Sequence, residues 1–334
     1  MSSQPLISVI IPTYKRPKEC LRAVRSVLIQ TCQDFEIIVG DDFDGDETEA
    51  LLVELGDSRV HYYKNGTAGG SACKNRNLCF ERSRGEYITF LDSDDMMLPR
   101  KLELQSKMLD EASEDVGFVI SGTRVVKVFK GQYYFDHDLV PSAEGDVSEA
   151  YFARKLCCYN TSMMVRREAL VLVGGWHHQM EPFDDAELIL RLMKQFQAKR
   201  LCDIVTVWFD HDGACLTNDL VGRQQGLVAF LTKYKEELSL HESWWRPRVN
   251  ELVKLCYLVG QRDDAKVWLS QIERRSFLQT VLLFTSRNSL LFKLTSLLSQ
   301  WLLAAKLAMP LKRKASMLND LIPAEDSSLV GNII

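Results

Sequence analysis

The sequence lacks the features that mark several large classes of protein. Its first residues, Met-Ser-Ser-Gln-Pro, have neither the basic nor the apolar region of a signal peptide. Its nine cysteines are an odd number and include no Cys-x-x-Cys pair, which fits neither a disulfide framework nor a zinc ribbon. We therefore expect a protein of a reducing compartment, the cytoplasm.

Acidic residues are absent from one long segment of the chain. Between Arg274 and Asn319 there is no Asp or Glu, whereas eight Lys and Arg residues occur there. Because the net charge of the whole chain is −4, the remainder carries −12. Basic residues can indicate nucleic-acid binding, but an acidic remainder and an apolar basic segment argue against that partner, so we expect no nucleic acid.

Patterns typical of buried strands and of helices alternate through the first half of the chain. A continuous apolar run, as in strands covered on both faces, occurs at 6–11, and further strands are predicted at 35–39, 59–63 and 86–91. Helical spacing of apolar residues follows each strand, at 18–30, 47–55, 72–82 and 99–109. This alternation predicts βαβ units and an α/β fold, with a Rossmann-like, mostly parallel, doubly wound sheet.

The second half has a mixed pattern that becomes helical. It predicts strands at 116–120, 162–165 and 199–208, a hairpin over 123–135, and helices at 184–196 and 219–234. Beyond residue 240 only helical patterns remain, including a helical hairpin at 249–259 and 265–272. We therefore expect one domain over 1–238 and a helical region over 239–334.

Three carboxylates lie within four residues where the fourth predicted strand ends, in the sequence Phe-Leu-Asp-Ser-Asp-Asp at 90–95. Carboxylates packed this closely repel one another, and burial adds a desolvation penalty. A divalent cation such as Mg²⁺ or Mn²⁺ removes that penalty and also binds phosphate oxygens. The same residues are good turn and helix N-cap formers, so the segment alone leaves a plain loop and a metal site open.

The ends of the other predicted strands favour the metal site. Pro12 to Tyr14 follows the first strand, Asp41-Asp42 the second, and Gly69 to Asn75 opens a helix after the third. Carboxyl ends of strands in an open α/β sheet form the ligand-binding crevice. Aspartates on one side of it and Lys74 on the other predict a site for a diphosphate and its metal.

These segments resemble family 2 glycosyltransferases, which have the GT-A fold and invert the sugar that they transfer. The resemblance rests on Ser-Val-Ile-Ile-Pro-Thr-Tyr at 8–14, Glu-Ile-Ile-Val-Gly-Asp-Asp at 36–42 and Gly-Gly-Ser-Ala-Cys-Lys-Asn at 69–75. It continues through 85–95, 162–170 with Gly-Gly-Trp at 174–176, and 184–191, and covers roughly residues 5 to 235. The domain over 1–238 is thus expected to be a GT-A glycosyltransferase domain.

The resemblance implies roles for the residues at the strand ends. Pro12, Tyr14 and Asp42 should line the nucleobase pocket, with Asp41 beside them, and Lys74 should approach the base or the diphosphate. Asp92, Ser93 and Asp94 form the Asp-x-Asp pattern that should bind the ribose and the metal, Mn²⁺ or Mg²⁺, with Asp94 or Asp95 as its direct ligand. For His211 two alternatives stay open, a weaker metal or phosphate ligand and a solvated loop residue.

The resemblance also implies an acceptor side. Asp184-Asp185 stands where the family has Glu-Asp, whose second member is the usual catalytic base; displacement at an anomeric carbon requires such a carboxylate to take the proton of the attacking hydroxyl. The alternative for Asp185 is an acid favoured by a helix N-terminus. Trp176, Glu181 and Asp184 are further acceptor-side candidates, and for Trp176 packing in the core is the alternative.

The basic segment at 277–314 predicts an amphipathic helix. Its apolar positions share one helical face: Leu290, Leu294, Leu297, Trp301, Ala305 and Ala308. The uncharged stretch from Leu294 to Ala305 is shorter than the about 20 residues that cross a bilayer, so we expect the helix to lie on an anionic membrane surface. The alternative is a helix packed on the catalytic domain.

The function that this resemblance implies is transfer of one hexose from a UDP-sugar to a lipid-linked acceptor. The missing Gln-x-x-Arg-Trp motif argues against a processive polymer synthase. We expect a polyprenyl-diphosphate saccharide of O-antigen or capsule type as acceptor, β1,3-glucosyl transfer to GlcNAc-diphosphate-lipid, and a location on the inner face of the cell membrane. The alternatives are a nucleotidyltransferase of similar fold and a non-catalytic sugar-nucleotide-binding protein.

Overall fold

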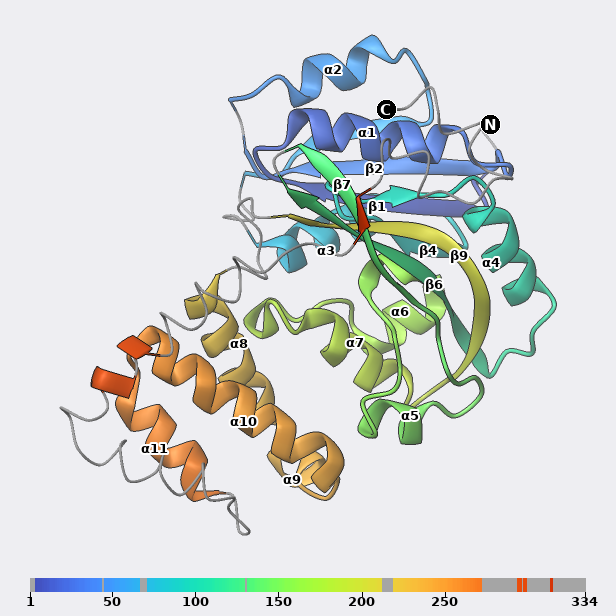
Figure 1. Ribbon diagram of the computed structural model, residues 1–334. Helices are drawn as coiled ribbons and strands as arrows, with labels where there is room; N and C mark the ends of the chain where they lie inside the picture. Colours follow the sequence, from blue (N-terminus) through green and yellow to red (C-terminus); the bar gives the residue numbers. More distant parts are fainter. Residues whose placement is uncertain are drawn as a thin grey trace.

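The computed structural model describes residues 4–43, 45–66, 71–129, 131–211, 219–271, 293–295, 297–298 and 313–314. A twisted sheet with helices on both faces forms one part, and a group of helices lies beside one end of it (Figure 1). The predicted α/β fold is confirmed.

The first half of the chain forms the parallel part of the sheet. Its strands lie in the order β3 (Val60–Lys64), β2 (Phe35–Asp41), β1 (Ile7–Thr13), β4 (Tyr87–Phe90), all parallel. The helices that follow β1, β2 and β3 are α1 (Pro17–Leu28), α2 (Thr48–Glu54) and α3 (Ala72–Arg82). Every residue of β1 and β2 is buried, because helices cover both faces of these strands.

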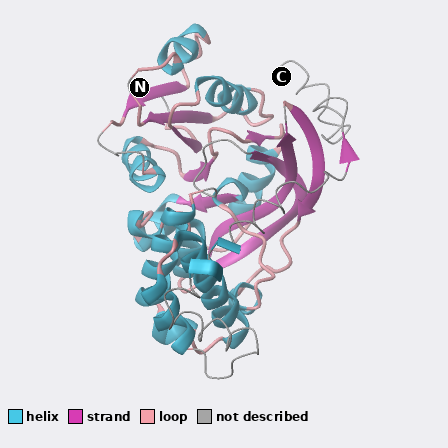
Figure 2. Cartoon of the chain, turned by 60° about the vertical axis from the view of Figure 1, so that its left-hand side comes forward, coloured by secondary structure: helices cyan, strands magenta, loops and turns pink. Residues whose placement is uncertain are grey.

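Beyond β4 the sheet becomes mixed. β8 (Met163–Arg166) lies antiparallel between β4 and β6 (Val116–Phe129), and β6 also pairs antiparallel with β7 (Gln132–Leu139) and parallel with β9 (Gln197–His211). The hairpin expected over 123–135 is thus the far end of a 14-residue strand and its partner. Figure 2 shows that these long strands are strongly curved.

Two short strands complete the sheet. β5 (Met96–Met97) pairs with β9, and β10 (Arg313–Lys314) pairs with β7. Since β8 is antiparallel to both β4 and β6, the strands β4 and β6 run in the same direction. The carboxyl ends of β1, β2, β3, β4, β6 and β9 therefore lie at one edge of the sheet, where the sequence predicts the site.

The remaining described elements are mostly helical. They are α4 (Lys101–Asp110), α5 (Ser148–Phe152), η1 (Asn160–Ser162), α6 (Arg167–Val173), η2 (His178–Met180), α7 (Asp184–Leu192), α8 (Leu220–Lys233), α9 (Lys235–Leu238), α10 (Glu242–Val259) and α11 (Arg262–Ser270). The predicted helical hairpin is α10 and α11, and Gly260 takes the left-handed conformation (φ 80°) that ends α10.

One apolar core joins the sheet to the helices α8 to α11. It contains Phe90 of β4 together with Trp244 and Leu252 of α10. The Trp244 ring stacks on Tyr151 of α5 with centroids 5.9 Å apart. The boundary predicted after residue 238 coincides with the end of α9, but this core continues across it.

The predicted membrane-surface segment at 277–314 lies outside the described residues except for 293–295 and 297–298, which are helical, and β10. Leu294 and Leu297, which the sequence places on the apolar face, are exposed. Among the described helices, none is both long and apolar enough to cross a membrane. The eight cysteines in the described part of the chain are free.

Candidate active site

A buried arginine connects two groups of aspartates that lie far apart in the sequence. Arg76 of α3 is 4% exposed, and its guanidinium donates to Asp92 Oδ1 at 2.6 Å and to Asp184 Oδ2 at 2.8 Å. Burial acts to lower the pKa of Arg76, but attraction by the two carboxylates outweighs it and raises the pKa. Arg76 therefore stays charged and holds the end of β4 against the start of α7.

The bridge continues into the core through uncharged groups. Asn160 donates to Asp184 Oδ2 at 2.9 Å and accepts from Trp176 Nε1 at 3.2 Å. Trp176 is 2% exposed and packs edge-on against Phe90, with ring centroids 4.7 Å apart. This burial favours the packing alternative for Trp176, because its ring has no surface on which a sugar would stack.

Asp94 lies where an arginine and a histidine from two other parts of the chain converge. Its Oδ2 contacts Arg16 Nη1, in the turn before α1, and lies 3.0 Å from Nε2 of His211 at the end of β9. Burial acts to raise the pKa of Asp94, but the His211 contact and the Arg16 charge lower it overall. The sequence prediction that groups His211 with this cluster thus matches the geometry.

Asp95 points away from this meeting point. It is 2% exposed, and its Oδ1 accepts from the Phe209 amide of β9 at 3.1 Å. Burial, and then the charges of Asp94 and Asp92, raise the pKa of Asp95 well above its ordinary value. Of the two metal ligands considered from the sequence, Asp94 is therefore the one whose carboxylate faces other side chains of the site.

The residues expected around a nucleobase lie at the ends of β1 and β2. Pro12 pairs with Gly40 and Thr13 with Asp41 at these ends, and the Asp42 amide donates to the Thr13 carbonyl. Tyr14 is 46% exposed and meets Phe43 edge-on at 5.8 Å.

Asp41 and Ser93 are the most enclosed members of the predicted nucleotide site. Asp41 accepts from Tyr62 Oη at 2.9 Å and is 1% exposed, and burial raises its pKa. Ser93 is 5% exposed. Because Tyr14 is exposed and Asp41 is buried, Tyr14 rather than Asp41 can contact a ligand.

The start of α3 does not present the arrangement predicted for a diphosphate. Glu181 Oε1 accepts from the Cys73 amide at 2.5 Å and from Ser71 Oγ at 3.0 Å, so a carboxylate of the chain itself caps this helix. Lys74 is exposed on the outer side of α3. Gly69 and Gly70, which the sequence includes in this site, lie outside the described residues.

Asp185 is half-buried at the second position of α7, next to Asp184. Its Oδ1 accepts from the Ala186 amide at 2.6 Å. Burial, followed by repulsion from Asp184, raises the pKa of Asp185 to about 7. A carboxyl group with this pKa can exchange a proton near neutral pH, whereas an ordinary helix N-terminal acid would be more acidic than usual.

Arg76, Arg16 and Asn160 were not identified from the sequence. A signal for Arg76 exists, because Lys74 to Asn77 places four polar residues in succession on a helix that must pack on a sheet. At least one of them has to face inward, and Asn75 and Arg76 do. Arg16 precedes α1 and Asn160 begins the short 3-10 helix η1, and the sequence carries no comparable signal for them.

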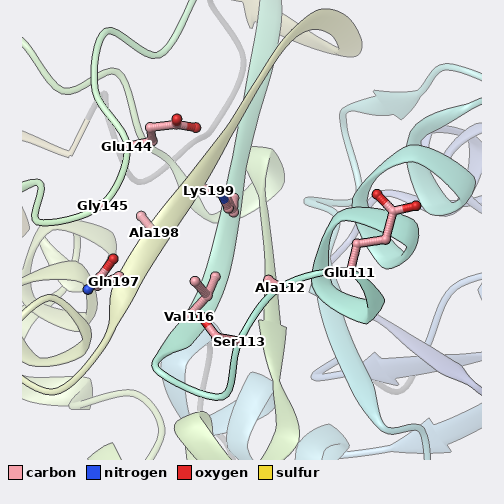
Figure 3. A pocket seen from close by; sticks show the side chains of 9 residues that line it. All are labelled: Glu111, Ala112, Ser113, Val116, Glu144, Gly145, Gln197, Ala198 and Lys199. Carbon is pink, nitrogen blue, oxygen red and sulfur yellow. The ribbon is translucent and has the colours of Figure 1, made fainter.

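A hollow of about 600 Å³ lies at the opposite edge of the sheet, where β6 and β9 begin. Figure 3 shows Glu111 and Glu144 on two of its sides, with Val116 and Lys199 between them. Because this hollow is at the amino ends of the strands, it is separate from the aspartates described above.

Comparison with known proteins finds a family whose model matches the first half of the chain. The family model described as glycosyl transferase family 2 matches residues 8–172. An uncharacterized glycosyltransferase of Rickettsia conorii is 40% identical over 129 residues, which are 38% of this chain and 20% of that protein.

A relative from Escherichia coli, named UDP-Glc:alpha-D-GlcNAc-diphosphoundecaprenol beta-1,3-glucosyltransferase WfgD, is 38% identical over 104 residues. The match covers 31% of this chain and 41% of the relative. The chain thus spans well under half the length of these two relatives.

Solved structures have the same fold at low sequence identity. S. aureus TarS 1-349 in complex with UDP-GlcNAc gives a TM-score of 0.55 at 14% identity, covering 85% of this chain and 88% of that one. A mannosyltransferase from Pyrobaculum calidifontis in complex with GDP-Man and Mn²⁺ gives 0.53 at 15% identity, covering 92% and 87%. The fold is therefore GT-A-like.

We predict that Arg76→Gln lowers the free energy of unfolding by about 3–5 kcal/mol, because the buried Asp184 and the partly exposed Asp92 lose their counter-charge. Denaturant unfolding measures this, with Lys107→Gln as control, since Lys107 forms an exposed ion pair with Glu111. Adding Asp184→Asn to Arg76→Gln should recover part of the loss. Equal stability of Arg76→Gln and the control would contradict the account.

Proposed function

Because residues 8–172 belong to glycosyltransferase family 2, we propose that the chain transfers one hexose from a UDP-sugar to a polyprenyl-diphosphate-linked saccharide, with inversion at the anomeric carbon. The observation that carries the proposal is the Arg76 bridge, since it joins the aspartates at the end of β4 to the helix that bears Asp185. Glucose, a β-1,3 linkage and a GlcNAc-diphosphate-lipid acceptor are our specific choice, supported by the name of the E. coli relative.

The donor is bound, in this proposal, along the carboxyl ends of β1, β2 and β4. Tyr14 and Phe43 offer aromatic surface for the base, with Asp42 accepting from its N–H. Asp92 faces the ribose. Arg16, which contacts Asp94, is positioned to approach the diphosphate as a cation once a ligand enters.

A divalent cation fits the residues around Asp94. The Asp94 carboxylate and the His211 imidazole lie 3.0 Å apart, and this oxygen and nitrogen pair suits Mn²⁺ or Mg²⁺. No group of three or more His, Cys, Asp or Glu arranged for a metal occurs among the described residues, so phosphate and water would have to complete the shell. Such an ion would neutralise the negative charge that develops on the leaving diphosphate.

Asp185 takes the proton in the transfer step. The acceptor hydroxyl attacks the anomeric carbon from the face opposite the diphosphate, its proton passes to the Asp185 carboxylate, and the bond from carbon to UDP breaks. A pKa of about 7 suits this role, because about half of the base is ionised at neutral pH and the ionised form still holds a proton well.

We further propose that the segment 277–314 binds an anionic membrane surface, which would hold the enzyme beside its lipid-linked acceptor on the inner face of the membrane. Its six basic residues, the absence of acids from 274 to 319 and the predicted apolar face support this role.

Asp185→Asn should lower kcat by about 10²–10⁴-fold while the affinity for the UDP-sugar stays near the wild-type value. In the wild type, log kcat should rise with pH below about 7 and level off above it, because only ionised Asp185 accepts the proton. Asp263→Asn is the matched control, since Asp263 is also the second residue of a helix. Near-native transfer by Asp185→Asn, or a rate independent of pH below about 7, would remove the assignment.

Chelation by EDTA should abolish transfer, and Mn²⁺ or Mg²⁺ should restore it. His211→Ala should raise the Mn²⁺ concentration needed for half-saturation at least about tenfold, measured by electron paramagnetic resonance with UDP present. His137→Ala, an exposed histidine on β7, serves as control. Transfer that EDTA leaves unchanged would refute metal dependence.

Removal of the residues after Phe277 should move the protein from the membrane fraction to the supernatant, because the basic apolar segment is then lost. Sedimentation with anionic vesicles measures the effect, and neutral vesicles are the control. Equal sedimentation of the truncated and full chains would show that the segment packs elsewhere.

A further inference from the structure

A second group of cationic residues lies near Asp185, on elements other than those that carry the donor aspartates. It comprises Arg154, just after α5, Arg223 on α8 and Arg248 on α10, with Glu251 as the acid between two of them. Glu251 binds Arg223 at 2.9 Å and Arg248 at 2.7 Å. We call these four residues the acceptor-side cluster; with three arginines and one glutamate it carries an excess of positive charge.

Arg248 has an unsatisfied donor in this cluster. Its guanidinium lies 5.7 Å from the ring of Phe183 and 5.5 Å from the ring of Trp244, and Nη1 donates to Glu251. Its Nε is buried and has no hydrogen-bond partner among the described residues. A buried donor without an acceptor is costly, so the described residues do not satisfy this guanidinium completely.

Arg154 is exposed and adopts the left-handed conformation, with φ 59°. Burial of part of its side chain, and then repulsion by Arg248, lower the pKa of Arg154. A non-glycine residue with positive φ beside a like charge costs free energy, and residues held in this way concentrate at functional sites. Arg248 thus has Glu251 as its acid partner, whereas Arg154 has a like charge beside it.

The cluster is close to the proposed base. Phe183, which Arg248 covers, is two residues before Asp185, and Tyr151 donates to the Ala186 carbonyl at 3.0 Å, one residue after it. The charges of both Asp185 and Arg248 act on Tyr151 and on Tyr159. An anion bound by Arg248 would thus lie beside the hydroxyl that Asp185 deprotonates.

We propose that Arg248 and Arg154 bind the diphosphate of the acceptor and so select acceptors whose sugar carries a phosphate. The inference rests on the proposed function, in which the donor diphosphate is held on the other side by Arg16 and the Asp94 region. In a sugar-diphosphate-lipid the diphosphate and the attacking hydroxyl are substituents of one ring, so their binding groups must be neighbours. Arg248 and Asp185 meet that requirement.

The test compares two soluble probes, GlcNAc-diphosphate bearing a short alkyl chain and the phosphate-free alkyl glycoside of GlcNAc. Calorimetry measures the affinity of each in detergent. Arg248→Gln and Arg154→Gln should each weaken binding of the diphosphate probe roughly 10- to 100-fold and leave the phosphate-free probe unchanged. Arg246→Gln, on the same helix and paired with Glu242, is the matched control and should bind both probes as the wild type does.

Three results would overturn the inference: wild-type affinity of both cluster variants for the diphosphate probe, equal weakening for both probes, or a loss confined to anionic phospholipid vesicles. The last would mean that the cluster binds bilayer headgroups. Arg154 is exposed, so its variant tests the site even if Arg248→Gln is poorly folded. Binding that depends on Arg248 in a protein that transfers no sugar would support the site and refute the proposed function.

Discussion

The ion pairs of Arg76 with Asp92 and Asp184 are the interaction on which the arrangement of the site depends. Asp184 and Arg76 are both buried, and each would be costly as a charge without its partner. Because the three groups come from the end of β4, from α3 and from α7, satisfying their charges fixes three elements of the fold relative to one another. The proposed donor and acceptor sides are therefore held in register by electrostatics inside a mostly apolar core.

The charges on the two sides of this bridge differ in a way that suits a displacement reaction. Around Asp94, basic groups surround a carboxylate and lower its pKa, which keeps it ionised for a cation. Around Asp185, burial raises the pKa to about 7, and the nearby arginines belong largely to the helices after residue 219. The helical region thus contributes to the proposed acceptor side as well as to the core, which gives it a role beyond attachment.

The alternation of strands and helices was predictable because apolar runs of strand length and helical periods are local signals, and the aspartates at strand ends follow from it. The contacts that turn residues make were not predictable from local signals. Lys74 was predicted to face the ligand, but it lies on the outer side of α3, while Arg76, two residues later, faces inward. Trp176 illustrates the same limit, since only the packed structure distinguishes a ring in the core from one that stacks on a sugar.

The central claim is that these two sides transfer a hexose with inversion between a nucleotide sugar and a lipid diphosphate saccharide. The most direct measurement incubates the full chain with a panel of UDP-sugars and GlcNAc-diphosphate-lipid, and determines the mass and anomeric configuration of the product by mass spectrometry and nuclear magnetic resonance. The account predicts addition of a single hexose in the configuration opposite to that of the donor. A product of retained configuration, or no sugar transfer from any donor, would contradict it.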